Sequence, residues 1–106
     1  MVVIARFPLP LLPVTSYQVY NFHMTKRQRI LAKILAGSKN IAFNDFTLLA
    51  ESFGFRLSRV SGSHHIYVHP NVKELVNLQE VHGQIKPYQI RQFMDLVERY
   101  NLEMEK

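Results

Sequence analysis

With 106 residues, 47% of them hydrophobic and 20% charged, the chain has the length and composition of one ordinary globular domain and not of a disordered segment. It contains no cysteine, which excludes disulfides and thiolate metal sites. Thirteen Lys and Arg residues against eight Asp and Glu give a net charge of +5, and a small basic domain favours an anionic partner, most commonly nucleic acid.

Residues 1–23 differ from the rest of the chain. They are apolar, but three prolines lie between residues 8 and 13, a spacing that fits neither a membrane-spanning helix nor a regular amphipathic one. The segment also lacks the basic start and the unbroken apolar run of a signal peptide. We expect residues 1–23 to be a tail or an over-long gene start before Met24, and residues 24–106 to form a single domain. The alternative is an extended arm that packs on the domain.

Two helices are predicted next. From Thr25, apolar residues recur at i, i+1, i+4 and i+5, which indicates an amphipathic helix that ends before Gly37. Residues 38–43 form a connector. Asn44 is then placed to cap a second helix, whose apolar face ends at Gly54.

Three strands follow, in a meander. Residues 55–60 alternate apolar and polar side chains and predict the first strand. The Ser-Gly-Ser sequence at residues 61–63 predicts a tight turn. Residues 64–69, HHIYVH, are rich in β-forming residues and predict a second strand that ends before Pro70. A third strand is expected within residues 73–81.

The last predicted element is a helix that begins at Pro87, because proline suits the first helical position. The preceding residues 82–85, HGQI, are predicted to be a loop. The order of two helices, three strands and one helix indicates an α+β fold, in which helices cover one face of an antiparallel sheet.

Positive charge is concentrated in two stretches. The first consists of Lys26, Arg27, Arg29, Lys33 and Lys39. Such a cluster is more typical of a solvated helix face than of an RNA-binding groove. The second stretch lies between Glu51 and Glu74, which contains no acidic residue but three of the five histidines. These histidines therefore lie in a locally cationic segment.

Two segments, FGFRLSRVSGSHHIYVHP and VHGQIKPYQIRQFMDLVERYNL, flank the third predicted strand in a recognisable order. Over residues 44–102 this ordered set resembles the HicA family of toxins, also called YcfA-like proteins. The resemblance implies a compact α-β-β-β-α core like a double-stranded-RNA-binding domain, with the helix at residues 25–36 as an addition. The chain departs from the family at residues 87–89, where Pro-Tyr-Gln replaces the typical Pro-Gly-Thr.

The resemblance also implies a function. HicA toxins are ribosome-independent, metal-independent endoribonucleases that cleave mRNA in the cytoplasm, and a HicB antitoxin holds them inactive. We therefore expect RNA and a HicB-like antitoxin as partners, and no membrane association. Two alternatives remain, namely a non-catalytic RNA-binding module of the same fold and a structural protein that only binds an antitoxin.

The catalytic residue that the resemblance implies is His64, the histidine that follows Gly-Ser. RNA can be cleaved by its own neighbouring 2′-hydroxyl if one group accepts that proton, another protonates the leaving oxygen, and cations hold the phosphate. Histidine titrates near neutral pH and suits either proton transfer. A single histidine without an obvious second acid predicts slow turnover.

RNA contacts are expected around this histidine. Arg59 and Lys86 are candidates for anchoring phosphates through their charge. Gly62 and Ser63 offer backbone N–H groups and a hydroxyl at the turn. His65 is a further candidate for contact with RNA.

The spacing of the histidines argues against a shared metal ion. His64 and His65 are neighbours in a strand and so point to opposite faces. His65 and His69 share a face but are separated by about 13 Å along a strand, whereas a zinc ion is bound by nitrogens at about 2 Å. We therefore expect neither a metal nor another cofactor.

Strand alternation and the family resemblance disagree about which histidine is exposed. Alternation groups His64 with Ile66 and Val68, and this apolar set is the one expected to face the core. The other set, expected on the surface, is His65, Tyr67 and His69. A histidine pair in a strand is also often purely structural. We follow the resemblance and assign the catalytic role to His64.

Overall fold

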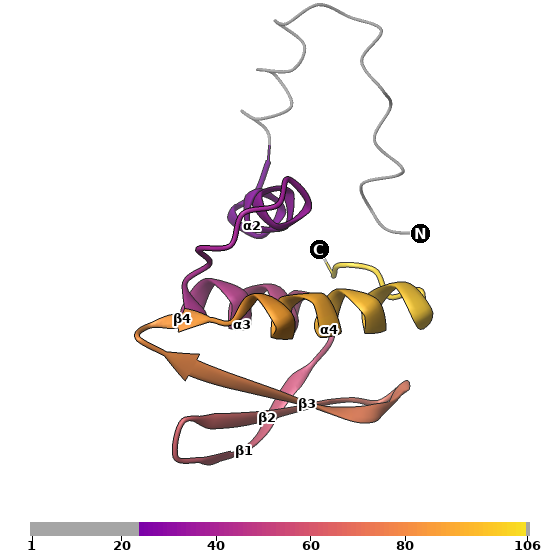
Figure 1. Ribbon diagram of the computed structural model, residues 1–106. Helices are drawn as coiled ribbons and strands as arrows, with labels where there is room; N and C mark the ends of the chain where they lie inside the picture. Colours follow the sequence, from indigo (N-terminus) through magenta and orange to yellow (C-terminus); the bar gives the residue numbers. More distant parts are fainter. Residues whose placement is uncertain (1–23, 106) are drawn as a thin grey trace, which may run out of the picture.

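The computed structural model describes residues 24–105 and has three layers (Figure 1). The elements in chain order are α2 (Lys26–Leu35), α3 (Phe43–Ser52), β1 (Arg56–Ser61), β2 (His64–His69), β3 (Val72–Val81), β4 (Gln84–Ile85) and α4 (Pro87–Arg99). This arrangement confirms the predicted α+β fold with an α-β-β-β-α core and an extra N-terminal helix. The prediction for residues 1–23 concerns a segment outside the described residues.

Helix α2 forms where the sequence predicted it. Thr25 caps the helix through a capping box, in which its hydroxyl accepts from the Gln28 N–H and the Gln28 side chain accepts from the Thr25 N–H. Ile30 and Leu31 are buried. Figure 1 shows α2 on the side of α3 and α4 that faces away from the sheet.

Helix α3 begins two residues earlier than predicted, so the assignment of Asn44 as its cap was wrong. Ala42 holds the cap position without a side-chain hydrogen bond, and Phe43 is the first helical residue. Tertiary contacts fix this start of the helix. Ala42 forms an isolated β-bridge with Gln84, and the Phe43 N–H donates to the Gly83 carbonyl at 2.9 Å. The β3–β4 turn thus supplies an acceptor that a capping side chain would otherwise provide.

The four strands form one antiparallel sheet in the order β1-β2-β3-β4. The prediction that residues 82–85 form only a loop was wrong, because Gln84–Ile85 pairs with Glu80 and Val81 as β4. His82 and Gly83 form the two-residue turn before it, with φ of 52° and 77°. Positive φ at both central residues matches the type I′ turn that joins tightly paired strands.

The helices cover one face of this sheet and leave the other open (Figure 1). The core contains the rings of Phe46, Phe53, Phe55 and Phe93, all 2% exposed or less. In β2 the buried residue is Tyr67, at 3% exposure. Cross-strand pairing places His65 opposite Leu78 and Tyr67 opposite Val76 on this covered face.

The face of β2 predicted to be buried was therefore the wrong one. His64 is exposed, and Ile66 and Val68 are only half-buried on the open face. Both faces of β2 carry large side chains, so alternation alone could not separate them. The core takes up Tyr67, whose ring is the largest in the strand.

Candidate active site

The hairpin between β1 and β2 presents His64 at the start of a strand. Ser61 and His64 pair directly across the two-residue turn made by Gly62 and Ser63. Gly62 has a φ of 61°, and the first central position of a type II′ turn requires such a positive value. A Cβ added at Gly62 would meet nothing within 4 Å. The turn therefore opens onto free space beside His64.

His64 is exposed on the open face and contacts one polar side chain. Its Nδ1 lies 3.2 Å from Oδ1 of Asn77 on β3. An amide oxygen can only accept a hydrogen bond, so this contact forms when Nδ1 carries the ring proton. Nε2 then holds a free lone pair and can accept a proton from a substrate.

Asn77 was missed by the sequence analysis. It lies 13 positions from His64 in the chain and becomes a neighbour only through the pairing of β2 with β3. That pairing places Asn77 opposite Ile66 and Gln79 opposite His64. No motif marked this asparagine in the sequence.

Ser63 is held from two sides. Its carbonyl accepts from the Glu80 N–H at 3.2 Å, and Nδ1 of His65 lies 3.1 Å from the same oxygen. Its hydroxyl accepts a long hydrogen bond of 3.5 Å from the Gln79 side chain. The turn is therefore tied to β3 next to His64.

His65 lies on the opposite face from His64. Its ring packs against Phe43, with 4.8 Å between the ring centroids, and the side chain is half-buried. Because a carbonyl only accepts, the contact with Ser63 makes Nδ1 of His65 a donor. The structure therefore does not bring His65 together with His64 on one face.

Arg59 and Lys86 flank the His64 end of the sheet. Arg59 lies opposite Ile66 on the open face, which makes it a diagonal neighbour of His64. Lys86 directly follows β4 and precedes α4. Lys86 is the cap residue of α4 and follows Ile85, which pairs with Glu80, the neighbour of Gln79 on β3.

The open face of β1, β2 and β3 carries no acidic side chain in the part of the chain that the structure describes. By cross-strand register, its residues are Arg56, Arg59, Ser61, His64, Ile66, Val68, Lys73, Leu75, Asn77 and Gln79. This face therefore combines cationic, amide and apolar groups, as a surface that holds a polyanion requires.

Tyr67 and His69 were both expected on the surface, and both expectations were wrong. Burial raises the pKa of the Tyr67 hydroxyl, and the nearby charge of Glu51 raises it further. The ring of His69 packs on Phe55, with 5.0 Å between centroids, and its Nδ1 accepts from the Asn71 N–H at 3.0 Å. Neither side chain is free to stack on a base.

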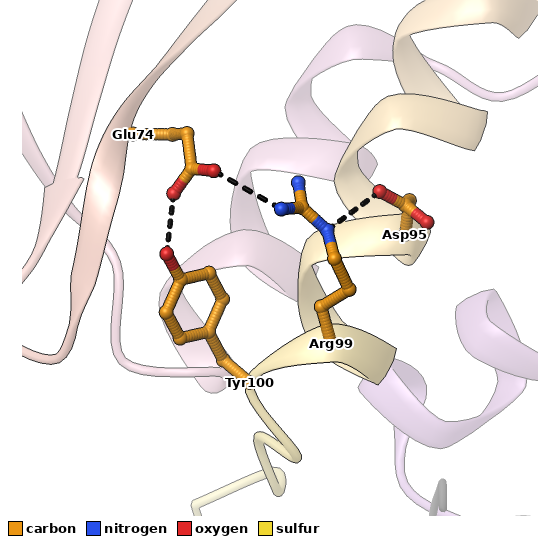
Figure 2. Close-up of polar contacts among 4 residues, drawn as sticks. All are labelled: Glu74, Asp95, Arg99 and Tyr100. Carbon is orange, nitrogen blue, oxygen red and sulfur yellow. Dashed lines mark hydrogen bonds and ion pairs between the residues drawn. The ribbon is translucent and has the colours of Figure 1, made fainter.

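A second polar cluster lies at the other end of β3 and joins it to α4 (Figure 2). The Tyr100 hydroxyl donates to Glu74 at 2.6 Å, and Arg99 bridges Glu74 at 3.2 Å and Asp95 at 2.9 Å. The hydrogen bond from Tyr100 is the main cause that lowers the pKa of Glu74, with the charge of Arg99 acting in the same direction. This cluster fastens the C-terminal end of α4 to the sheet.

Among residues 24–105, no three His, Cys, Asp or Glu side chains lie close enough together to hold a metal ion. The helices within that same range are also too short or too polar to span a bilayer.

Comparison with known proteins gives one result. The family model described as the HicA toxin of bacterial toxin-antitoxin systems matches residues 43–97, which is more than half of the chain. The match begins at the first residue of α3, includes all four strands, and ends within α4. No curated protein and no solved structure gave a significant match.

Proposed function

Because the chain belongs to the HicA toxin family of bacterial toxin-antitoxin systems, we propose that it is an mRNA-cleaving endoribonuclease with His64 as its catalytic residue. The observation that carries the proposal is the position of this histidine. Of the three histidines between residues 61 and 70, only His64 is exposed, with one ring nitrogen on Asn77 and the other free. His65 and His69 pack against phenylalanine rings instead.

The proposed reaction uses the RNA's own 2′-hydroxyl. Nε2 of His64 accepts the 2′-hydroxyl proton, the 2′-oxygen bonds to the adjacent phosphorus, and the bond from phosphorus to the 5′-oxygen breaks. The products are a 2′,3′-cyclic phosphate and a 5′-hydroxyl. The leaving oxygen takes its proton from solvent, so we expect turnover to be slow.

The surrounding residues hold the phosphate in this proposal. Arg59, a diagonal neighbour of His64 on the open face, and Lys86, which follows β4, supply positive charge. At Gly62 the absence of a side chain lets a phosphate approach the turn backbone. The Ser63 hydroxyl adds a polar contact. His65 acts by supporting the turn from the covered face, through Phe43 and the Ser63 carbonyl.

The proposal extends to the partner and the compartment. A HicB-like antitoxin binds the protein and blocks access to mRNA, in keeping with the toxin-antitoxin family. Since its substrate is mRNA, the protein acts in the cytoplasm. The functional unit in this proposal is a single domain of residues 24–106.

The test compares His64→Ala with His65→Ala in cleavage of a purified transcript. A general base contributes about 100- to 10,000-fold in rate, so His64→Ala should lose cleavage and growth arrest while RNA affinity changes less than about tenfold. His65→Ala should reduce activity less. Circular dichroism checks that both variants fold, and end analysis of the products should find 2′,3′-cyclic phosphates.

Four outcomes would contradict parts of this proposal. A fully active His64→Ala variant would remove the catalytic assignment, and an inactive His65→Ala variant with its fold intact would move that assignment by one residue. If the wild-type protein, freed of antitoxin, binds RNA but cuts nothing, it is a non-catalytic RNA-binding module. Added chelator should have no effect, and a loss of activity with chelator would contradict the metal-independent reaction.

A further inference from the structure

Gln89, in the first turn of α4, is a buried polar residue that reaches into the sheet. Its side chain is 6% exposed and makes two hydrogen bonds with β3. Its Oε1 accepts from the Gln79 N–H at 3.1 Å, and its Nε2 donates to the Asn77 carbonyl at 3.2 Å. One side-chain amide thus binds a backbone donor and a backbone acceptor of the same strand.

The position of Gln89 follows from the shortness of β4. This strand pairs only with Glu80 and Val81, so the outer edge of β3 has no strand partner at residues 77–79. A side-chain amide has the same donor and acceptor groups as a peptide bond. Gln89 therefore takes the place of the missing strand and fixes the backbone of β3 at this point.

The two residues that Gln89 holds are the two β3 neighbours of His64. Asn77 places its side-chain oxygen 3.2 Å from Nδ1 of His64. Gln79 lies directly opposite His64, and its side chain reaches the Ser63 hydroxyl. Gln89 thus binds their backbones at the strand edge, and their side chains contact the catalytic hairpin on the open face.

We propose that Gln89 is a positioning residue for the catalytic histidine. By fixing the backbone of residues 77–79, it holds the Asn77 amide where that amide accepts the Nδ1 proton of His64. His64 is then kept in the tautomer whose Nε2 has a free lone pair. This inference rests on the proposed catalytic role of His64.

Two backbone groups of β3 would lose their hydrogen-bond partner if the Gln89 amide were removed. Without the Gln89 amide, the Gln79 N–H and the Asn77 carbonyl are left unpaired under α4, and the strand edge must move toward water to satisfy them. A hydrogen bond weakens steeply beyond its normal length, and the bond from Asn77 to His64 already measures 3.2 Å. A small displacement of β3 therefore breaks it.

The first experiment uses Gln89→Met, which keeps the length of the side chain and removes its amide. The matched control is Gln92→Met, the same substitution at an exposed position one turn along α4. The ¹⁵N chemical shifts of the His64 ring report the tautomer directly, in the full-length protein without RNA. Histidine in water favours the proton on Nε2, so Gln89→Met should move His64 toward that form, as Asn77→Ala should.

Kinetics supply a second readout. We expect Gln89→Met to lower kcat about 10- to 100-fold and to leave KM nearly unchanged, because the orientation of the base is lost and the cationic groups remain. Gln92→Met should leave both the tautomer and kcat as in the wild type. If Gln89→Met fails to fold, Gln89→Glu retains the acceptor for the Gln79 N–H and should give a partial tautomer shift.

A folded Gln89→Met or Gln89→Glu protein whose His64 tautomer matches the wild type would overturn the inference, whatever its activity. So would an equal shift in Gln92→Met. Because the tautomer is measured without a substrate, a failure of His64→Ala to lose cleavage would refute the proposed function separately.

Discussion

Strand β2 begins and ends with a histidine, and its two ends differ in almost every physical respect. His64 follows an open hairpin turn, and its ring hydrogen-bonds to the Asn77 amide. His69 lies on Phe55, accepts from the Asn71 N–H, and approaches Gly54 so closely that a Cβ there would be 2.7 Å from its Nε2. The same residue type is thus exposed with a free ring nitrogen at one end and packed against an aromatic ring at the other.

The comparison predicts its largest effect on stability at Gly54. This glycine has a φ of 97°, so Gly54→Ala adds backbone strain to the close contact with His69. We expect a loss of about 2–4 kcal/mol of unfolding free energy. Urea denaturation measures this value.

The matched variant is Gly62→Ala, at a φ of 61° with no neighbour within 4 Å of the new Cβ. It should lose only about 1 kcal/mol, from backbone strain alone. Equal losses in the two variants would show that the two ends of β2 do not differ in packing as described.

The second-largest expected effect is on the salt dependence of RNA affinity at the end of β2 that carries His64. Each phosphate contact releases counterions, so Arg59→Ala and Lys86→Ala should each reduce the salt slope of RNA affinity by about one unit. Fluorescence anisotropy at several salt concentrations measures the slope. Arg27→Ala on α2 is the control, because α2 lies on the side of the helices away from the sheet (Figure 1). An equal change for Arg27 would place RNA binding elsewhere.

A smaller effect is expected on the covered face. Tyr67→Phe removes the buried hydroxyl but keeps the ring in the core. We expect a loss of about 1 kcal/mol in unfolding free energy and no change in RNA cleavage. A variant that folds normally yet fails to cleave RNA would show that the covered face takes part in the reaction.

The smallest effect is a pH dependence at the cluster of Figure 2. The Tyr100 hydroxyl lowers the pKa of Glu74 below its ordinary value of 4.5. A carboxyl whose pKa is lower in the folded state contributes stability above the ordinary pKa and loses it as the pH falls through the folded value. Tyr100→Phe should therefore lose less stability than the wild type between neutral pH and about pH 3. A steeper loss in urea midpoints would contradict this sign.

The fold was largely predictable because its signals are local. The capping box at Thr25, the proline that opens α4 and the turn at Gly62 each specify a boundary within a few residues. Two of the predictions that failed did so for non-local reasons. Helix α3 begins before Asn44 because the Phe43 N–H bonds to the Gly83 carbonyl from the β3–β4 turn. The buried face of β2 is the one opposite to that predicted, because Tyr67 packs into the core of phenylalanine rings.

The site was predictable only where a motif marks it. The position of His64 follows from the Gly-Ser-His sequence and the family resemblance. Asn77 and Gln89 could not be found in this way, because their roles depend on the register of β3 and on the short β4. Gln89 even stands in the stretch where the chain departs from the family pattern, so resemblance alone gave it no role.

The outer strand β1 has a consequence for handling the purified protein. Within residues 24–105 no strand pairs with its outer edge, all six of its residues are exposed, and two of them are the apolar Leu57 and Val60. Such an edge can recruit the strand of another molecule and start aggregation. A bulge between Leu57 and Arg59 interrupts its regular hydrogen-bonding row, and the arginine places a charge beside it. The same guanidinium that we assign to phosphate binding therefore also keeps neighbouring molecules from joining their sheets.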